Sequence, residues 1–135
     1  MDFTILAQTP LFQGIPAEEL EKIFAVLNIS KSCFRKGEML AMQDELVNRL
    51  IILTRGSVKA EMTDPSGKLI KVEDIEAPNP LAILFLFGNH NRFPVQATAR
   101  EMVEAVIIPK QCVLQLLAAN ELILKNYLDI SADFA

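Results

Sequence analysis

The residues best suited to chemistry lie in one short stretch, where a polar run follows the longest apolar run of the chain. The apolar run extends from Leu81 to Phe87, and the polar run is Gly88-Asn89-His90-Asn91-Arg92. Apolar side chains with a few polar groups among them are typical of small-molecule pockets. We therefore predict a pocket for a mostly apolar or aromatic ligand. The candidate ligand-binding residues are Ile83, Phe85, Phe87, Asn89, His90, Asn91, Arg92 and Phe93.

The same stretch has a second interpretation, which the sequence leaves open. The apolar side chains would fill the interior of a barrel, and the polar cluster would form an exposed loop. A single histidine in a loop rich in Gly and Asn is usually solvated, so His90 alone does not decide between the two.

Enzymatic and metal chemistry find little support in the rest of the chain. His90 is the only histidine, and there is no Ser/His/Asp pattern or Gly-rich nucleophile turn, so we predict no catalytic residues. Cys33 and Cys112 lie far apart and match no metal, redox or iron–sulfur spacing. We expect both cysteines to be buried free thiols, and we expect no metal site and no cofactor.

Length, charge and hydropathy limit the classes of function further. The chain has 135 residues, of which 51% are hydrophobic and 22% charged, as in one globular domain with its own core. Its net charge of -4 disfavours direct binding to phosphate backbones, so any contact with DNA needs another segment. The N-terminus is not a signal peptide, and no apolar run could cross a membrane. We expect a cytoplasmic protein with no membrane partner.

The elements that would position the candidate residues begin with a helix. Pro16 suits a first helical turn, and the glutamates that follow it favour a helix N-terminus. Apolar residues then recur at three- and four-residue spacing from Leu20 to Leu27. The pattern predicts a helix from about Ala17 to Leu27.

The middle of the chain has a different period, which is typical of short strands. Segments rich in Val, Ile, Leu and Met alternate with turn residues, and Asp64-Pro65-Ser66-Gly67 is the clearest hairpin turn. Many short strands at this spacing predict a mainly β fold with flanking helices, a double-stranded β-helix (jelly-roll) sandwich of about eight strands. The predicted strands include residues 39–42, 49–54, 57–63, 68–75, 95–99 and 102–108.

Two helices are predicted at the C-terminal end, the first starting near Pro109 and the second covering 121–135. The second is apolar over an unusually wide arc, since Leu124 and Leu128 mark a second line beside the main one. It also reaches the last residue without a capping signal, so we expect a helix cut before its end. The main line would either fold back on the barrel or pair with another chain. It consists of Ile123, Tyr127, Ile130 and Phe134.

Several motifs in this order resemble the cyclic-nucleotide-binding domains, and the final helix resembles the dimer helix of Crp/Fnr transcription regulators. The resemblance implies the sensing domain of such a regulator, with the jelly-roll fold predicted above. Residues 1–120 would be the effector domain, and 121–135 the start of a dimerisation helix, with no DNA-binding domain. The matching motifs are Leu11-Phe12-Gln13-Gly14-Ile15, Phe34-Arg35-Lys36-Gly37-Glu38-Met39-Leu40, the stretch from Leu50 to Lys59, and Asp64-Pro65-Ser66-Gly67-Lys68.

The chain departs from that family where the ligand would bind. In the family a Glu accepts the ribose hydroxyl and an Arg pairs with the cyclic phosphate. The resemblance places Ala82-Ile83 near the position of the Gly-Glu pair, and Phe93-Pro94 where the Arg and a small residue belong. A cyclic phosphate would be desolvated there without a partner. We therefore expect no response to cyclic AMP.

The resemblance also implies partners, and two alternatives stay open. The partners would be an unidentified small-molecule effector, a second copy of the chain through the C-terminal helix, and DNA only through a domain outside this chain. One alternative is a genuine cyclic-nucleotide module that uses Arg92 in a shifted register. The other is a cupin-like protein that binds a small molecule on the same type of barrel, although metal-binding cupins use several His or carboxylate ligands.

Overall fold

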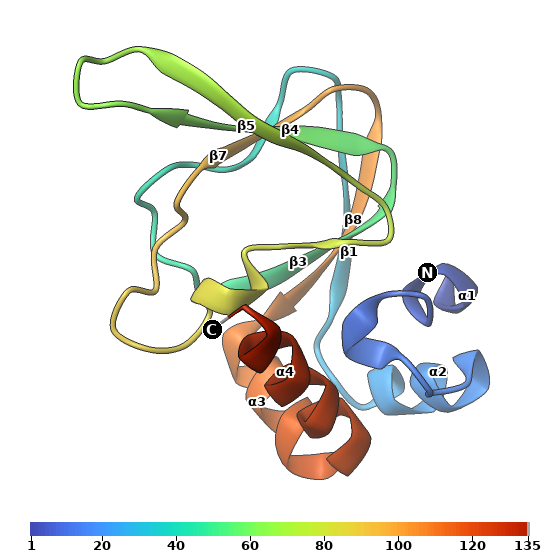
Figure 1. Cartoon of the computed structure of the whole chain (residues 1–135). Helices are drawn as coiled ribbons and strands as arrows, with labels where there is room; N and C mark the ends of the chain where they lie inside the picture. Colours follow the sequence, from blue (N-terminus) through green and yellow to red (C-terminus); the bar gives the residue numbers. More distant parts are fainter. Residues whose placement is uncertain (135) are drawn as a thin grey trace.

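Two antiparallel sheets face each other in the computed structural model, which describes residues 1–134 (Figure 1). The sheets have the strand orders β1-β8-β3-β6 and β2-β7-β4-β5. This arrangement confirms the predicted mainly β jelly-roll sandwich, and the described residues form eight strands. Their bounds are β1 Ser30–Phe34, β2 Met39–Ala41, β3 Arg49–Arg55, β4 Ser57–Thr63, β5 Leu69–Glu76, β6 Pro80–Leu81, β7 Gln96–Ala99 and β8 Val103–Pro109.

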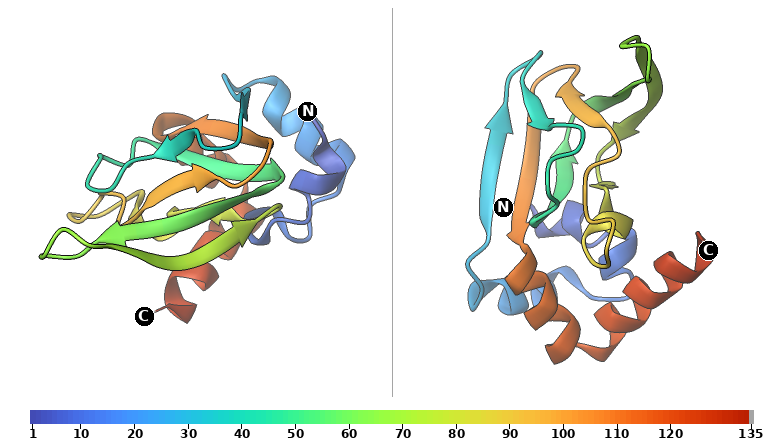
Figure 2. Two further views of the ribbon diagram at one scale, coloured as in Figure 1. Left: turned by 90° about the horizontal axis from the view of Figure 1, so that it is seen from above. Right: turned by 90° about the vertical axis from the view of Figure 1, so that its left-hand side faces the viewer.

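The helices gather at one end of the sandwich, with α3 and α4 beside the N-terminal helices (Figure 2). The predicted N-terminal helix is α2, which follows Pro16 as expected. The two predicted C-terminal helices are α3 and α4, but α4 ends at Asp133 with Phe134 as its C-cap, and position 135 lies outside the described residues. The helical elements are α1 Phe3–Leu6, η1 Pro10–Phe12, α2 Ala17–Ala25, η2 Ile83–Phe85, α3 Lys110–Ala119 and α4 Glu121–Asp133.

The central strand β3 is buried on both faces, because the opposite sheet covers one face and helices cover the other. Residues 50 to 53 are almost fully buried, and both α1 and α3 contact β3. This explains why its sequence is an unbroken apolar run and not an alternation. In β4, by contrast, Val58 and Ala60 are buried while Lys59 and Glu61 are only half-buried, which is the alternation of a strand with one solvent-facing side.

The hairpin of β4 and β5 projects beyond the rest of the sandwich (Figure 1). Its turn is the predicted one, and the Asp64 carboxylate accepts hydrogen bonds from the Ser66 hydroxyl and from the Ser66 and Lys68 amides. The hydroxyl bond of Ser66 lowers the pKa of the Asp64 carboxyl. Strand β5 lies at the edge of its sheet, and all its residues except Ile75 are exposed.

Two predictions about burial need correction. Cys112 is buried as expected, but Cys33 is exposed, because it lies on the edge strand β1 with its side chain outside the core. The apolar run from Leu81 to Phe87 was expected to be buried, and only Leu81, Ile83 and Leu86 are. The run bends into β6 and η2, which turns its other side chains toward the helices and the surface. Among the described residues, no helix is both long enough and apolar enough to cross a membrane.

We predict that Gly56→Ala destabilises the fold much more than Gly67→Ala does. Both glycines have positive φ, +82° for Gly56 and +88° for Gly67. A Cβ on Gly56 would lie 2.4 Å from the backbone oxygen of Met102, whereas a Cβ on Gly67 would meet nothing within 4 Å. Denaturant unfolding should therefore show a loss of about 1 kcal/mol for Gly67→Ala and about 3 kcal/mol or more for Gly56→Ala. Equal losses would contradict the close approach of the β7–β8 connection to Gly56.

Candidate ligand pocket

A pocket of about 550 Å³ lies between the edge strand β5 and the last turn of α4. Its walls come from β5, from the β5–β6 connection, from η2 and from α4. The pocket therefore lies between the sandwich and the final helix. The lining residues are Pro10, Glu73, Asp74, Ile75, Glu76, Asn79, Pro80, Ile83, Ile130, Asp133 and Phe134.

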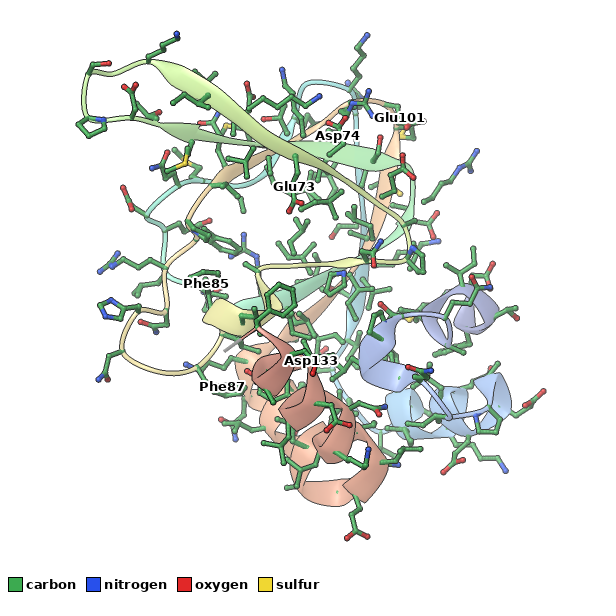
Figure 3. All side chains as sticks on the ribbon, in the orientation of Figure 1. Glu73, Asp74, Phe85, Phe87, Glu101 and Asp133 are labelled. Carbon is green, nitrogen blue, oxygen red and sulfur yellow. The ribbon has the colours of Figure 1, made fainter. Side chains whose placement is uncertain are left out.

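Two adjacent acidic residues of β5 point to opposite sides of the strand (Figure 3). Glu73 pairs with Ala60 of β4, which is buried, so its side chain projects toward the inside of the sandwich. Asp74 projects to the outside, where its carboxylate lies 3.0 Å from the Lys71 amine and 3.5 Å from Nε of Arg100. The inner carboxylate has no such partner among the described residues.

The segment around η2 is attached to α4 by one aromatic side chain. The Tyr127 hydroxyl lies 3.5 Å from the backbone oxygen of Ile83, to which it donates. The Tyr127 ring packs edge-to-face on Phe87, with centroids 5.7 Å apart, and the Lys110 amine lies 5.2 Å from the centre of the Phe87 ring. A displacement of η2 would therefore change the contacts of the middle of α4 directly.

The first half of α4 is anchored to the N-terminal segment. The Asn126 side-chain amide donates to the backbone oxygens of Leu11 and Gln13, at 3.0 and 2.9 Å. Ile123 is fully buried in the core, and the Asn120 side chain accepts from the Ile123 amide at the start of the helix. The anchored half holds the second half of α4 in place as one wall of the pocket.

The predicted ligand-binding residues do not form one group. Ile83 lines the pocket, whereas Phe87 packs on Tyr127 and Phe85 packs, half-buried, against the core. Asn89 and His90 are exposed in the loop after η2, as the second interpretation of this stretch expected.

The rest of that loop is held by the segment that precedes β3. The Asn91 backbone oxygen accepts from the Val47 amide, and the Arg92 guanidinium donates to the backbone oxygen of Asp44 at 2.8 Å. Phe93 is 2% exposed and lies under Arg49, whose guanidinium is 5.5 Å from the ring centre. Phe93 is therefore a core residue and does not face the pocket.

The predicted dimer-contact residues of α4 also differ in their exposure. Ile123 is buried within the chain and is not available to a partner, while Tyr127 and Ile130 pack partly against the core. Phe134 is 75% exposed. In the second apolar line of α4, Leu124 is 38% and Leu128 57% exposed, so this line is more exposed than the first three residues of the predicted one. The reason is geometric, since the helix turns its main apolar line toward η1 and η2.

Four acidic residues of the pocket were not among the predicted site residues; they are Glu73, Asp74, Glu76 and Asp133. Among residues 1–134, no lysine, arginine or histidine lines the pocket beside them. Glu73 lies in the predicted strand 68–75, but nothing local in the sequence indicated that this strand meets the end of α4. In residues 1–134 no group of three or more His, Cys, Asp or Glu residues could hold a metal ion. The pocket is therefore a negatively charged, partly apolar cleft.

Comparison with known proteins gives a consistent result. The family model of the cyclic nucleotide-binding domain matches residues 31–120. A transcriptional regulator from Thermotoga maritima is 30% identical, with a TM-score of 0.75 over 85% of this chain and 88% of that one. No curated protein sequence matches the chain.

Two further solved structures share the fold. The sensor domain of the transcriptional regulator DNR from Pseudomonas aeruginosa is 21% identical, with a TM-score of 0.78 over 96% of this chain and 86% of that one. The catabolite activator protein from Thermus thermophilus is 19% identical, with a TM-score of 0.80 over 92% of this chain. The chain spans 57% of the length of that protein.

We predict that the phenol of Tyr127 titrates at higher pH in the folded protein than in denaturant, because burial raises its pKa. Tyr127 is the only tyrosine, so the ultraviolet absorbance of tyrosinate reports this group alone. Since the folded pKa exceeds the unfolded one, stability should be retained below the unfolded pKa and lost as the pH rises through the folded one. Tyr127→Phe should lack this alkaline loss. The same titration midpoint in both states would show that Tyr127 does not pack against η2.

Proposed function

Because the chain belongs to the cyclic nucleotide-binding domain family, we propose that it is the effector-sensing domain of a Crp/Fnr-type transcription regulator. The observation that supports this most directly is that residues of the β sandwich, residues of η2 and residues of α4 line one pocket. Barrel residues such as Ile83 and helix residues such as Ile130 line the same cavity, so a ligand there contacts both. Its binding would favour one position of α4 over others, and a bound ligand can shift an equilibrium only through such differential contact.

The effector in this proposal is not cyclic AMP or cyclic GMP. Arg92, next to the expected phosphate position, is exposed and its guanidinium donates to the Asp44 backbone. Phe93 is in the core, and the pocket itself presents carboxylates and no cationic side chain. An anionic phosphate placed there would lose its hydration and face like charges. These features also count against the alternative that uses Arg92 in a shifted register.

In the same proposal α4 passes the signal to a second copy of the chain. Its first half is held by Ile123 and Asn126, and its outer side presents Leu124 and Leu128 to solvent. Exposed leucines in one line along a helix are typical of helix–helix interfaces. Residues 1–120 would then be the effector domain and α4 the start of the dimerisation helix. DNA would be bound by another domain of the regulator. The same proposal includes a cytoplasmic location and no enzymatic role.

We predict no measurable binding of cyclic AMP or cyclic GMP. Calorimetric titration should give dissociation constants weaker than about 1 mM for both nucleotides, which corresponds to about -4 kcal/mol or less favourable. A family member that binds cyclic AMP, titrated in the same buffer, serves as the positive control. A micromolar dissociation constant for either nucleotide would show that the phosphate is held by residues other than those expected.

We predict that self-association depends on the exposed apolar residues of α4, which include Leu128 of the outer line and Phe134 of the main line. Leu128→Glu and Phe134→Glu should each weaken the dimer at least about tenfold in sedimentation equilibrium, because each buries a charge in the interface. Val26→Glu is the matched control, since Val26 is 84% exposed and is the C-cap residue of a different helix, α2. If all three variants and the wild-type chain sediment identically, α4 is not the dimer helix.

A further inference from the structure

We propose that the free edge of β5 pairs with β5 of a second copy of the chain, so that one continuous sheet runs through both copies. Strand β5 is the last strand of the order β2-β7-β4-β5 and lies along one margin of that sheet (Figure 2). A free edge presents backbone N–H and C=O groups that another strand can satisfy. The inference goes beyond the proposed function, since it needs neither an effector nor dimerisation through α4.

The edge strand carries large apolar side chains that its own chain leaves exposed. Leu69, Ile70 and Val72 are 48%, 42% and 51% exposed, on the hairpin that projects beyond the sandwich (Figure 1). Met62, which pairs with Ile70 across the hairpin, is 39% exposed. A group of exposed apolar side chains of this kind marks a surface that binds another chain.

The pairing with β4 determines which side chains of β5 lie on the inner face of the sheet. Ile75 pairs with Val58, which is fully buried in the sandwich, so Ile75 lies on the inner face. Ile70 lies on the same face, because its partner Met62 is four residues from Val58 along β4. Both isoleucines therefore point to the side of the strand on which the pocket lies.

The outer face of β5 carries a pair of opposite charges. Lys71 and Asp74 lie 3.0 Å apart, and their partners in β4 are Glu61 and Lys59, which alternate with the inner-facing residues. Val72 is the extra residue of a bulge, which explains why two residues on one face are three positions apart. The strand thus has an apolar pair on its inner face and a charged pair on its outer face.

Both pairs have the same midpoint in the sequence, between positions 72 and 73. A two-fold axis at that midpoint, with the two strands antiparallel, places Ile70 opposite Ile75 of the second copy. The same axis places Lys71 opposite Asp74 of the second copy, and each contact occurs twice. A shift of the register by one residue would set inner-facing residues against outer-facing ones. The edge therefore complements itself in charge and in apolar surface in this register.

The pocket beside β5 would accept one side chain of the second copy. In this register Ile70 of the second copy lies on the inner face beside Ile75, which lines the cavity together with Ile83 and Ile130. An isoleucine that is exposed in the single chain would thus be buried, twice in each dimer. A small molecule and the second copy would compete for the same cavity.

The edge also carries features that limit pairing. Lysines, inward-pointing charges and bulges protect edge strands from aggregation, and β5 has Lys71, Glu73 and the bulge at Val72. In the two-fold register Lys71 has a carboxylate opposite it and the two bulges lie next to each other, while the two Glu73 carboxylates share one face near the axis and weaken the contact. These features disfavour other registers and leave a closed dimer, which consumes both edges.

The first experiment measures association by sedimentation equilibrium, in the Leu128→Glu chain throughout, so that α4 does not contribute. Ile70→Gln should weaken association at least about tenfold, because it changes two buried contacts in each dimer. Leu69→Gln is the matched control, since the neighbouring residue pairs with Thr63 on the outer face. It should change the dissociation constant by less than about twofold.

The second experiment tests the register by disulfide trapping. Cys33→Ser is added to the same chain, because Cys33 is an exposed thiol. A mixture of the Lys71→Cys and Asp74→Cys variants should form cross-linked dimers at least about tenfold faster than either variant alone, since the two positions lie opposite each other. A mixture of Lys71→Cys and Leu69→Cys, two positions on the same outer face, is the register control and should not cross-link faster.

Three results would overturn the inference. The Leu128→Glu chain could remain monomeric at millimolar concentration, Ile70→Gln and Leu69→Gln could change its association equally, or the two cysteine mixtures could cross-link at the same rate. Each would assign the charges and the bulge of β5 to protection of the sheet edge. The proposed function would be unaffected, since the pocket would be left to a small molecule and α4 to the dimer.

Discussion

The attachment of α4 to the N-terminal segment is the constraint on which the pocket depends. Asn126 bonds two backbone oxygens of the η1 segment, and Ile123 is buried beside them, so the helix leaves the core in one direction. That direction brings its last turn next to β5 and closes a cavity that neither element would form alone. Tyr127 adds a second link, between α4 and Ile83 of η2, and Ile83 lines the same cavity.

The charge of this cavity distinguishes the chain from what its family name would suggest. A cyclic nucleotide needs a cation for its phosphate, and the cationic side chains near the site are engaged elsewhere. Arg92 donates to a backbone oxygen, Arg49 lies on the Phe93 ring, and Lys110 lies on the Phe87 ring. The fold is that of the family, and in our proposal the pocket binds another kind of ligand.

The sequence predicted what depends on local patterns and missed what depends on distant contacts. The hairpin turn at Asp64, the start of α2 after Pro16 and the strand periods follow from neighbouring residues, and the structure confirms them. Exposure of Cys33 depends on β1 being an edge strand, which no local pattern shows. The acidic pocket likewise needs β5 and α4 to meet, although about fifty residues separate them in the chain.

We propose that the effector binds between β5 and α4 and is not a cyclic nucleotide. Native mass spectrometry of the protein as purified, followed by a crystal structure of any complex found, tests it most directly. We expect a phosphate-free molecule in contact with Ile83 and with residues 130–134 at the end of α4. A cyclic nucleotide bound to Arg92, or a ligand elsewhere in the barrel with no contact to α4, would contradict it.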